Sequence, residues 1–457
     1  MALGKRRSDH QELWVATTSL PSSPGHPFYD ALNALLGETD FDRKVEAMCE
    51  PHYAKVGRPS IPPGVYFRML FVGYFEGISS QRGIAWRCQD SLSIRAFLGL
   101  AVDARSPDHS SLTVIRKRLP MEVYDEVFTL VLSLAASKGL LSGKLVGVDS
   151  TMIEANAAMK TIVRRDTKED WKTYVRGLAE EEGVEIEDDE DLRRFDKGRK
   201  GKKVSNKDWE SPTDPDAKIA KMKDGRTHLA YKVEHAIDLE HEIALSAAVH
   251  PADRGDADTL PDALLRAQGN VFATGSSQLV EGLAADKGYH KAESLAEVEA
   301  FGLGTRTYVC VPDSPSRRRW RDKPRAWKAA TIRNRQRLRG SRNREYQRLR
   351  SERVERSFAH SCESGASRRS WLRGIVNVSK RYVAHVAAMN LGTILRKLIG
   401  VGTPKEMADL RAALAAFFAS LTALMNLPPS RTRALIEFEP IDTRPIGGDA
   451  AFALGAA

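Results

Sequence analysis

Two acidic residues follow apolar runs that read as buried strands, and their placement predicts a site for divalent cations. Asp149 ends the run that starts at Leu145, and Asp286 follows the apolar segment 278–285. One such carboxylate usually caps a strand or starts a turn, but two on adjacent strands of one sheet would lie close together. Neighbouring carboxylates raise each other's pKa, so a site that keeps both ionised normally holds a cation. Oxygen ligands without clustered Cys or His favour Mg²⁺ or Mn²⁺ over zinc.

Such a site suits phosphoryl transfer if a third carboxylate closes it. A pair of divalent ions can activate a nucleophile and stabilise the leaving oxygen of an in-line displacement, so two ions are expected. Glu355 is the candidate, because Val354 and Phe358 have the spacing of a core-facing helix stripe and Glu355 lies beside them. Glu352, three residues earlier, is the fallback choice. The predicted catalytic and metal-binding residues are therefore Asp149, Asp286 and Glu355.

Positive charge is concentrated in one segment of the chain. Residues 316–356 hold 17 Lys or Arg and only 4 Asp or Glu, whereas the whole chain has a net charge of +10. A solvated helix face is the ordinary explanation of a charged run, but like charges this dense repel unless an anion neutralises them. The segment therefore predicts contact with the phosphates of a nucleic acid. The predicted DNA-binding residues, with Lys287 added because it follows Asp286, are Lys287, Arg317, Arg318, Arg319, Arg321, Arg333, Arg335, Arg337, Arg350, Arg353 and Arg356.

The elements expected to position these residues form an α/β architecture. Residues 1–135 read as a helical domain for DNA binding or dimerisation, whose short helices fit a helix-turn-helix or a plain bundle equally well. From residue 144 the order is a strand, a hairpin of two strands, and then helices alternating with strands. That order is typical of a ribonuclease-H-like mixed sheet flanked by helices, assigned to residues 136–375. Residues 376–427 are expected to form C-terminal helices and 428–457 a mobile tail.

A charged stretch at about 160–226 interrupts the predicted catalytic domain. It includes residues 180–191, where nine of twelve are acidic, and few apolar residues recur there at any period. We expect an insertion without a packed core, helical only around 170–179.

Other features of the sequence indicate the setting. The four cysteines are far apart and form no CxxC pair, so neither a zinc site nor a disulfide framework is expected. The longest apolar stretch near the C-terminus, 412–425, is 14 residues, short of the roughly 20 that a membrane span needs. No apolar segment follows the charges near Met1, so no secretory signal is expected. We expect a cytoplasmic protein without membrane contact.

Several short blocks resemble the bacterial insertion-sequence transposases of the DDE class, in the branch with an IS-five-type catalytic domain. Their order and spacing carry the resemblance over roughly residues 25 to 400. The blocks are Gly147-Val-Asp149-Ser-Thr-Met-Ile-Glu-Ala-Asn156, Ala284-Ala-Asp286-Lys-Gly-Tyr289, Arg350-x-x-x-Val-Glu355-Arg-x-Phe358, Asp214-Pro-Asp216-Ala, Gly57-Arg-Pro-Ser-Ile-Pro-Pro63 and Ser106-Pro-Asp-His-Ser-Ser-Leu112. The sequence departs from the family at Cys362, where the family often has Lys.

The resemblance implies DNA transposition by a metal-dependent enzyme. Cleavage at the terminal inverted repeats and transfer of 3′-OH ends to target DNA would occur at Asp149, Asp286 and Glu355. The partner that the resemblance implies is double-stranded DNA, both the transposon ends and the target, and the protein would join the bacterial nucleoid when it binds DNA. Because two DNA ends must be processed together, a homodimer is expected. Two other functions fit the same residues: a structure-selective nuclease of ribonuclease-H-like fold, and a non-catalytic DNA-binding regulator derived from a transposase.

Overall fold

The computed structural model describes residues 25–425 apart from 58, 102, 201–204 and 313–319. The tail expected at 428–457 lies outside the described residues. The chain forms two compact units, Met1–Pro404 and Lys405–Ala457. None of the helices in the described part of the chain is long and apolar enough to cross a membrane.

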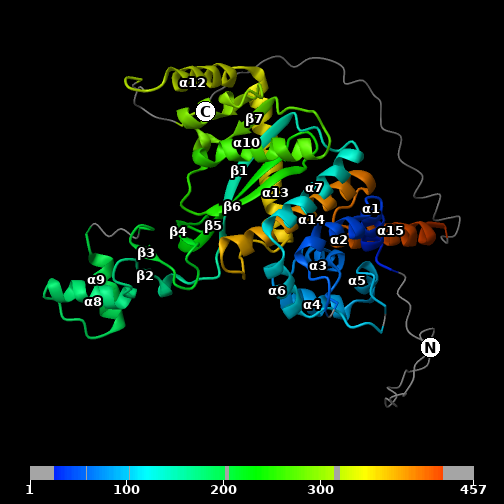
Figure 1. Ribbon diagram of the computed structural model, residues 1–457, viewed down its shortest axis with the longest axis horizontal. Helices are drawn as coiled ribbons and strands as arrows, with labels where there is room; N and C mark the ends of the chain where they lie inside the picture. The colour runs from blue at the N-terminus through cyan, green and yellow to red at the C-terminus, as the bar shows by residue number, and fades with distance from the viewer. Residues whose placement is uncertain (1–24, 58, 102, 201–204, 313–319, 426–457) are drawn as a thin grey trace, which may run out of the picture. The chain divides into compact units, whose positions relative to one another are not determined.

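Helices dominate the chain before the sheet, as the apolar spacing there predicts (Figure 1). The helix α3 begins at Pro63, where proline suits a helix start, and is buried along almost its whole length. The helices α2, α4 and α14 (Ile375–Ile399) pack around it. The α-helices of this region are α1 (Pro27–Gly37), α2 (Phe41–Cys49), α3 (Pro63–Phe75), α4 (Gln81–Asp90), α5 (Leu92–Phe97), α6 (His109–Arg118) and α7 (Met121–Ser137).

A six-stranded mixed sheet follows, in the order β4-β5-β1-β7-β8 with β6 also paired to β5. The strand β1 pairs antiparallel with β5 and parallel with β7, which in turn pairs parallel with β8. The strands are β1 (Leu145–Glu154), β4 (Lys218–Lys221), β5 (Thr227–Asp238), β6 (Ala244–Pro251), β7 (Gly282–Ala285) and β8 (Arg306–Val309). The predicted α/β class and mixed sheet are confirmed, and the ribonuclease-H-like assignment stays a prediction.

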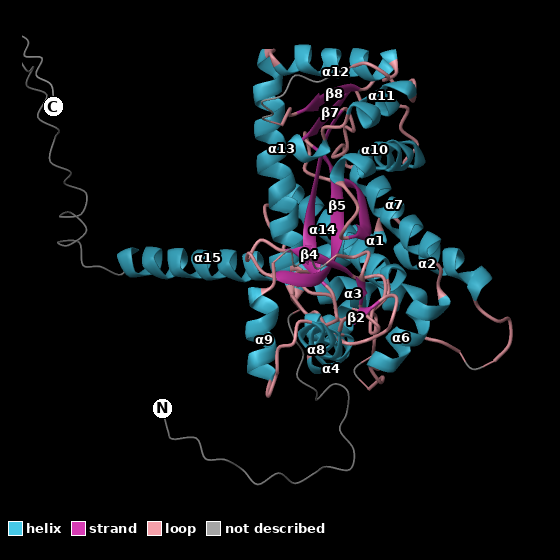
Figure 2. Ribbon diagram, turned by 90° about the vertical axis from the view of Figure 1, so that its left-hand side faces the viewer, coloured by secondary structure: helices cyan, strands magenta, loops and turns pink. Residues whose placement is uncertain are grey.

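Helices cover both faces of the sheet (Figure 2). On one face, α10 (Asp256–Ala273) and α11 (Ala292–Ala300) pack around a core that includes Val146, Val148, Leu283 and Ala285. The helix α13 (Ser341–Ala359) lies on the opposite side from α10 and contacts β1, β5 and β7. The basic helix α12 (Arg325–Leu338) packs on α11 and β8.

The charged stretch is a small folded module, so the prediction of an insertion without a core is wrong. Val175, Ala179, Leu192 and Trp209 are buried, and Arg164 lies over the rings of Tyr174 and Trp209. A few apolar side chains among many charges build this core, too few to produce a period in the sequence. The module's elements are β2 (Val163–Arg164), α8 (Trp171–Glu181), α9 (Asp189–Gly198) and β3 (Trp209–Glu210).

The expected bounds of the insertion also need correction. The strand β4 falls inside the predicted range 160–226 but belongs to the main sheet, where it pairs with β5. Part of the acidic run forms the first turn of α9, whose N-cap is Asp188. Negative charge is favourable there because the amide groups at a helix N-terminus carry partial positive charge.

The expected C-terminal helices are present. The helix α14 is buried along most of its length and packs against α7, α3 and β6. The helix α15 (Pro404–Met425) lies almost entirely in the second compact unit. Several of its large apolar side chains are exposed, among them Leu410, Leu414 and Phe417.

Candidate active site

The strands β1 and β7 bring Asp149 and Asp286 to neighbouring positions. Their parallel register pairs Val148 with Ala285, and each aspartate is the next residue in the chain. Asp286 follows the end of β7, but β1 continues to Glu154, so the prediction that this strand ends at Asp149 is wrong: the more polar residues after Asp149 still pair with β5. Val148 and Ala285 point into the core under α10. Because side chains alternate along a strand, Asp149 belongs to the opposite face, on which α13 packs.

Both carboxylate oxygens of Asp149 have partners. Its Oδ1 accepts a hydrogen bond from the Ser150 amide (2.8 Å), and its Oδ2 accepts one from Arg350 Nη1 (2.7 Å). Burial raises the pKa of the Asp149 carboxyl, and the negative charge of Asp286 raises it further. The Ser150 amide and the Arg350 guanidinium act in the opposite direction. Arg350 is therefore the internal counter-ion of this carboxylate.

A further carboxylate, Asp256, lies beside Asp286 and was not found from the sequence. A Cβ added at Gly288 would lie 3.0 Å from both Asp256 Oδ2 and Asp286 Oδ1, so glycine allows the two to come close. The Gly288 amide donates to Asp286 Oδ1 (2.7 Å). Asp256 Oδ1 accepts from Ser150 Oγ (2.8 Å) and Lys232 Nζ (3.0 Å). Asp256 begins α10, and because aspartate is common at the start of a helix, its residue type alone indicates no function.

The absence of a side chain at Gly147 lets α13 approach β1. A Cβ there would lie 2.7 Å from Leu239 Cδ2 and 3.0 Å from Val354 Cγ2. Val354 is fully buried, and Phe358 stacks on the ring of His235 with 4.4 Å between centroids. These contacts fix α13 on the face of the sheet that carries Asp149.

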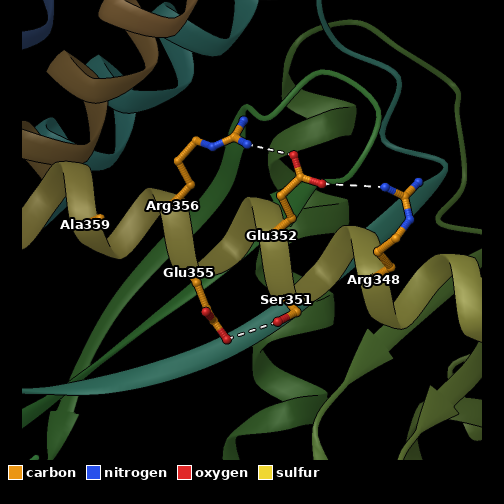
Figure 3. A pocket seen from close by; sticks show the side chains of 6 residues that line it. All are labelled: Arg348, Ser351, Glu352, Glu355, Arg356 and Ala359. Atoms are coloured by element: carbon orange, nitrogen blue, oxygen red, sulfur yellow. Dashed lines mark hydrogen bonds and ion pairs between the residues drawn. The ribbon is translucent and has the colours of Figure 1, made fainter.

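The two glutamates that were considered as the third carboxylate lie in different surroundings on α13 (Figure 3). Glu352 lies between Arg356 Nη2 (2.7 Å) and Arg348 Nη1 (3.7 Å). Glu355 points away from this cluster and accepts a hydrogen bond from Ser351 Oγ (3.1 Å), and no ion pair reaches it among the described residues. All five side chains line a surface hollow of about 690 Å³. Glu355 thus has no basic partner among the described residues, whereas Glu352 has two.

Helix periodicity separates Glu355 from Arg353. Arg353 binds the carbonyl oxygens of Leu239 and Glu240, in the turn that adjoins the start of β1. Val354 faces the sheet, so residues 353 and 355 lie on opposite flanks of the helix at about 100° per residue. Glu355 therefore lies on the flank of α13 away from this turn.

The residues present fit a divalent ion in part. Asp149 and Asp286 are hard oxygen ligands side by side, and Mg²⁺ in proteins is often held by one or two carboxylates together with substrate phosphates. No three acidic, His or Cys side chains gather closely enough to hold a metal ion within the described part of the chain. Glu355 is not brought into contact with the pair, so its role as third ligand stays a prediction.

The predicted DNA-binding residues fall into three groups. Arg317, Arg318 and Arg319 lie outside the described residues. Lys287, Arg321 and Arg335 are exposed. Five others bind groups of the protein itself: Arg333 and Arg337 bind Glu299, Arg350 binds Asp149, Arg353 binds backbone carbonyls, and Arg356 binds Glu242 and Glu352. The sequence of a basic segment alone does not show which of its side chains pair with acidic side chains or backbone carbonyls of the same chain.

Two family models match the chain. Residues 19–118 match a transposase domain (DUF772), and residues 194–391 match a transposase DDE domain. The chain belongs to the DDE transposases of insertion sequences. Comparison of this transposase with curated proteins and with solved structures found no match.

The two matches fit the arrangement of the fold. The DDE match includes Asp286 and Glu355 and runs from the folded module into α14, whereas Asp149 precedes its first residue. The first match covers the helices α1 to α6. A DDE domain implies an enzyme that cleaves nucleic acid and transfers strands, and this family normally uses a divalent metal.

Proposed function

We propose that this transposase cleaves DNA at the terminal inverted repeats of its element and joins the freed 3′-OH ends to target DNA. Asp149, Asp286 and Glu355 hold the divalent ions, expected to be two Mg²⁺ or Mn²⁺. The observation that carries the proposal is the position of Asp149 and Asp286 directly after the paired residues Val148 and Ala285 of two parallel strands, beside the helix that bears Glu355. Two partly buried carboxylates so close together are costly unless a cation neutralises them.

The side chains around this pair have separate roles in the reaction. Divalent ions bound there would activate the attacking oxygen and neutralise charge on the reacting phosphate. Arg350 neutralises Asp149 in the structure, and its guanidinium would be available to a DNA phosphate if a divalent ion neutralised that carboxylate instead. Lys287 and Arg335, which are exposed, bind the phosphate backbone beside the reacting strand.

A strand-transfer assay with DNA that carries the ends of the element tests the proposal. Asp149→Asn and Asp286→Asn abolish both cleavage and joining but leave DNA binding intact, since neither change removes a positive charge. Asp262→Asn is the matched control, because Asp262 lies on α10 and binds only Arg254 among the described residues. Full activity of Asp149→Asn in Mg²⁺ would refute the assignment. Cleavage by the wild type without joining would indicate a nuclease, and metal-independent binding alone a regulator.

Two copies of the chain act together in the proposal, and α15 offers a surface for their contact. Met407, Leu410, Leu414 and Phe417 recur at alternating steps of three and four residues, and the sequence continues this spacing through 421 and 424. This is the heptad pattern of a coiled coil. Leu410, Leu414 and Phe417 are 43%, 48% and 61% exposed, so the apolar stripe is open to a partner.

The polar side chains of α15 are compatible with two copies of this helix packed in parallel. Ser420 Oγ and Thr422 Oγ1 donate to carbonyl oxygens four residues earlier in the helix, so their hydroxyls are already satisfied. Glu406 and Arg411 occupy the heptad positions that flank the stripe, where the Glu of one helix meets the Arg of the other in a parallel pair. A second copy of α15 therefore matches both the apolar stripe and the flanking charges.

A further inference from the structure

A cavity separate from the hollow on α13 lies where α3, α4 and α6 meet α14 and the segment before it. Its volume is about 240 Å³, smaller than the roughly 300–1,000 Å³ of sites for drug-sized ligands. Arg82, Arg116, His109 and Arg381 line it, and no acidic side chain does so among the described residues. A small cavity with positive side chains and no carboxylate is suited to an anion.

Two of these arginines present unpaired donors inside the protein. Arg116 is only 8% exposed, and although its Nε donates to Asn377 Oδ1 (3.2 Å), its buried Nη1 has no hydrogen-bond partner in the described part of the chain. The buried Nη2 of Arg381 likewise lacks a partner among the described residues, while its Nε donates to His385. Burial and the charge of Arg116 lower the pKa of Arg381 to about 10. A buried polar donor left unsatisfied is costly, and two buried like charges are more so.

The N-termini of two helices add donors to the same cavity. Gln81 and Arg82 form the first turn of α4, whose N-cap Ser80 accepts from the Gly83 amide, and His109 begins α6. Amide groups and the helix dipole at such positions favour a negative group.

Arg82 is held beside the cavity by a chain of side chains. Arg82 Nε donates to His109 Nε2 (3.3 Å), and His109 Nδ1 lies 3.0 Å from Asp108 Oδ2. Nε2 is thus the ring nitrogen that faces Arg82, and Nδ1 is the one that faces Asp108. No carboxylate pairs with Arg82 among the described residues, so its guanidinium is available to a ligand.

We propose that this cavity binds a phosphate group, with Arg116 and Arg381 as its buried donors and the N-terminus of α4 beside them. Planar guanidinium groups bind phosphate oxygens through paired hydrogen bonds, which would satisfy the two buried donors. An ion pair from the protein itself would require an acidic residue in the lining, and none is present among the described residues.

The position of the cavity relative to Asp149 suits a phosphate of the DNA backbone. Trp371, which lines the cavity, belongs to a segment bonded to the end of β1: the Glu154 amide donates to the Arg368 carbonyl, and the Ser370 amide donates to the Glu154 carbonyl. At roughly 3.3 Å per residue, Glu154 lies about 17 Å along β1 from Asp149. That span corresponds to about five base pairs of DNA. This assignment of the phosphate to DNA rests on the proposed function, whereas phosphate binding itself does not.

Thermal unfolding of the full chain in inorganic phosphate, against chloride at equal ionic strength, tests the cavity directly. Phosphate raises the unfolding temperature of the wild type. It raises the unfolding temperature of Arg82→Ala by a smaller amount and does not change that of Arg381→Met. In phosphate-free buffer Arg381→Met unfolds no earlier than the wild type, because a buried unpaired charge is removed. Arg68→Met is the matched control: Arg68 is also buried but binds Asp42, so this variant unfolds earlier and keeps the phosphate response. A wild type without the response, or an equal response in Arg381→Met, would overturn the proposal.

The salt dependence of DNA binding identifies the source of the phosphate. If the phosphate belongs to DNA, the plot of log affinity against log salt concentration is less steep for Arg381→Met than for the wild type. The slope differs by about 0.9, the value for one lost phosphate contact. An unchanged slope with a lost phosphate response assigns the cavity to a free phosphate compound and still supports the site. Loss of cleavage in every assay would refute the proposed function without changing the thermal result.

Discussion

Replacing Gly147 by alanine should disrupt the packing of α13 on β1. The new Cβ would lie 2.7 Å from Leu239 Cδ2 and 3.0 Å from Val354 Cγ2, and both side chains are fully buried. Neither can move into solvent, so the helix or the turn at Leu239 must shift. Overpacking of this kind typically costs about 1–3 kcal/mol. A shift of about 1 Å at a catalytic group can also reduce the rate about 100-fold.

Urea unfolding monitored by circular dichroism, together with the cleavage assay, measures both effects. Gly269→Ala is the matched control, because Gly269 lies inside α10 with nothing within 4 Å of an added Cβ. That change should stabilise the protein by about 0.5–1 kcal/mol, since alanine loses less conformational freedom in a helix. If Gly147→Ala were as stable and active as Gly269→Ala, the close approach of α13 to β1 would be refuted.

Three other predictions concern different parts of the chain. Burial lowers the pKa of His235 to about 3. As pH falls below about 6.5, this histidine therefore takes up a proton in the unfolded state but not in the folded state, and it should lower the free energy of unfolding by about 2 kcal/mol from pH 7 to 5. His235→Gln should reduce this drop, and an unchanged pH profile would contradict the prediction. Trp209→Ala removes a buried aromatic of the small module, at a typical cost of about 3–5 kcal/mol, and should cause new proteolytic cleavage within 163–210; an unchanged digest would count against a folded module. Leu414→Asp should convert a dimer into a monomer by light scattering, whereas Ala415→Asp, outside the apolar stripe, should not; equal mass for both variants would contradict pairing through α15.

The position of the Asp pair follows from sequence because it depends on local patterns. Asp149 and Asp286 each end a run of apolar residues, and such runs form buried strands that need no long-range information to recognise. Because β1 and β7 are parallel neighbours, the residues that follow their paired apolar runs come together, although β1 itself continues to Glu154. The Val354 and Phe358 stripe likewise predicts which side of α13 is buried.

Contacts between distant segments are not visible in the sequence. The density of charge at 316–356 predicts DNA contact for Arg337 and Arg353, but Arg337 binds Thr307 and Glu299, and Arg353 binds backbone carbonyls of a distant turn. A long side chain can reach either a phosphate or a carbonyl group, and only the fold decides which is near. The partners of Asp256 and the core of the small module depend on the same tertiary information.

Metal binding by the third carboxylate is the most direct test of the proposed active site. Mn²⁺ affinity of the transposase bound to DNA, measured by electron paramagnetic resonance, should fall in Glu355→Gln, and strand cleavage should be lost while DNA binding is kept. Glu352→Gln removes an equal charge from the same helix and should keep both the affinity and the cleavage. Normal Mn²⁺ affinity and cleavage in Glu355→Gln, or their loss only in Glu352→Gln, would contradict a site made of Asp149, Asp286 and Glu355.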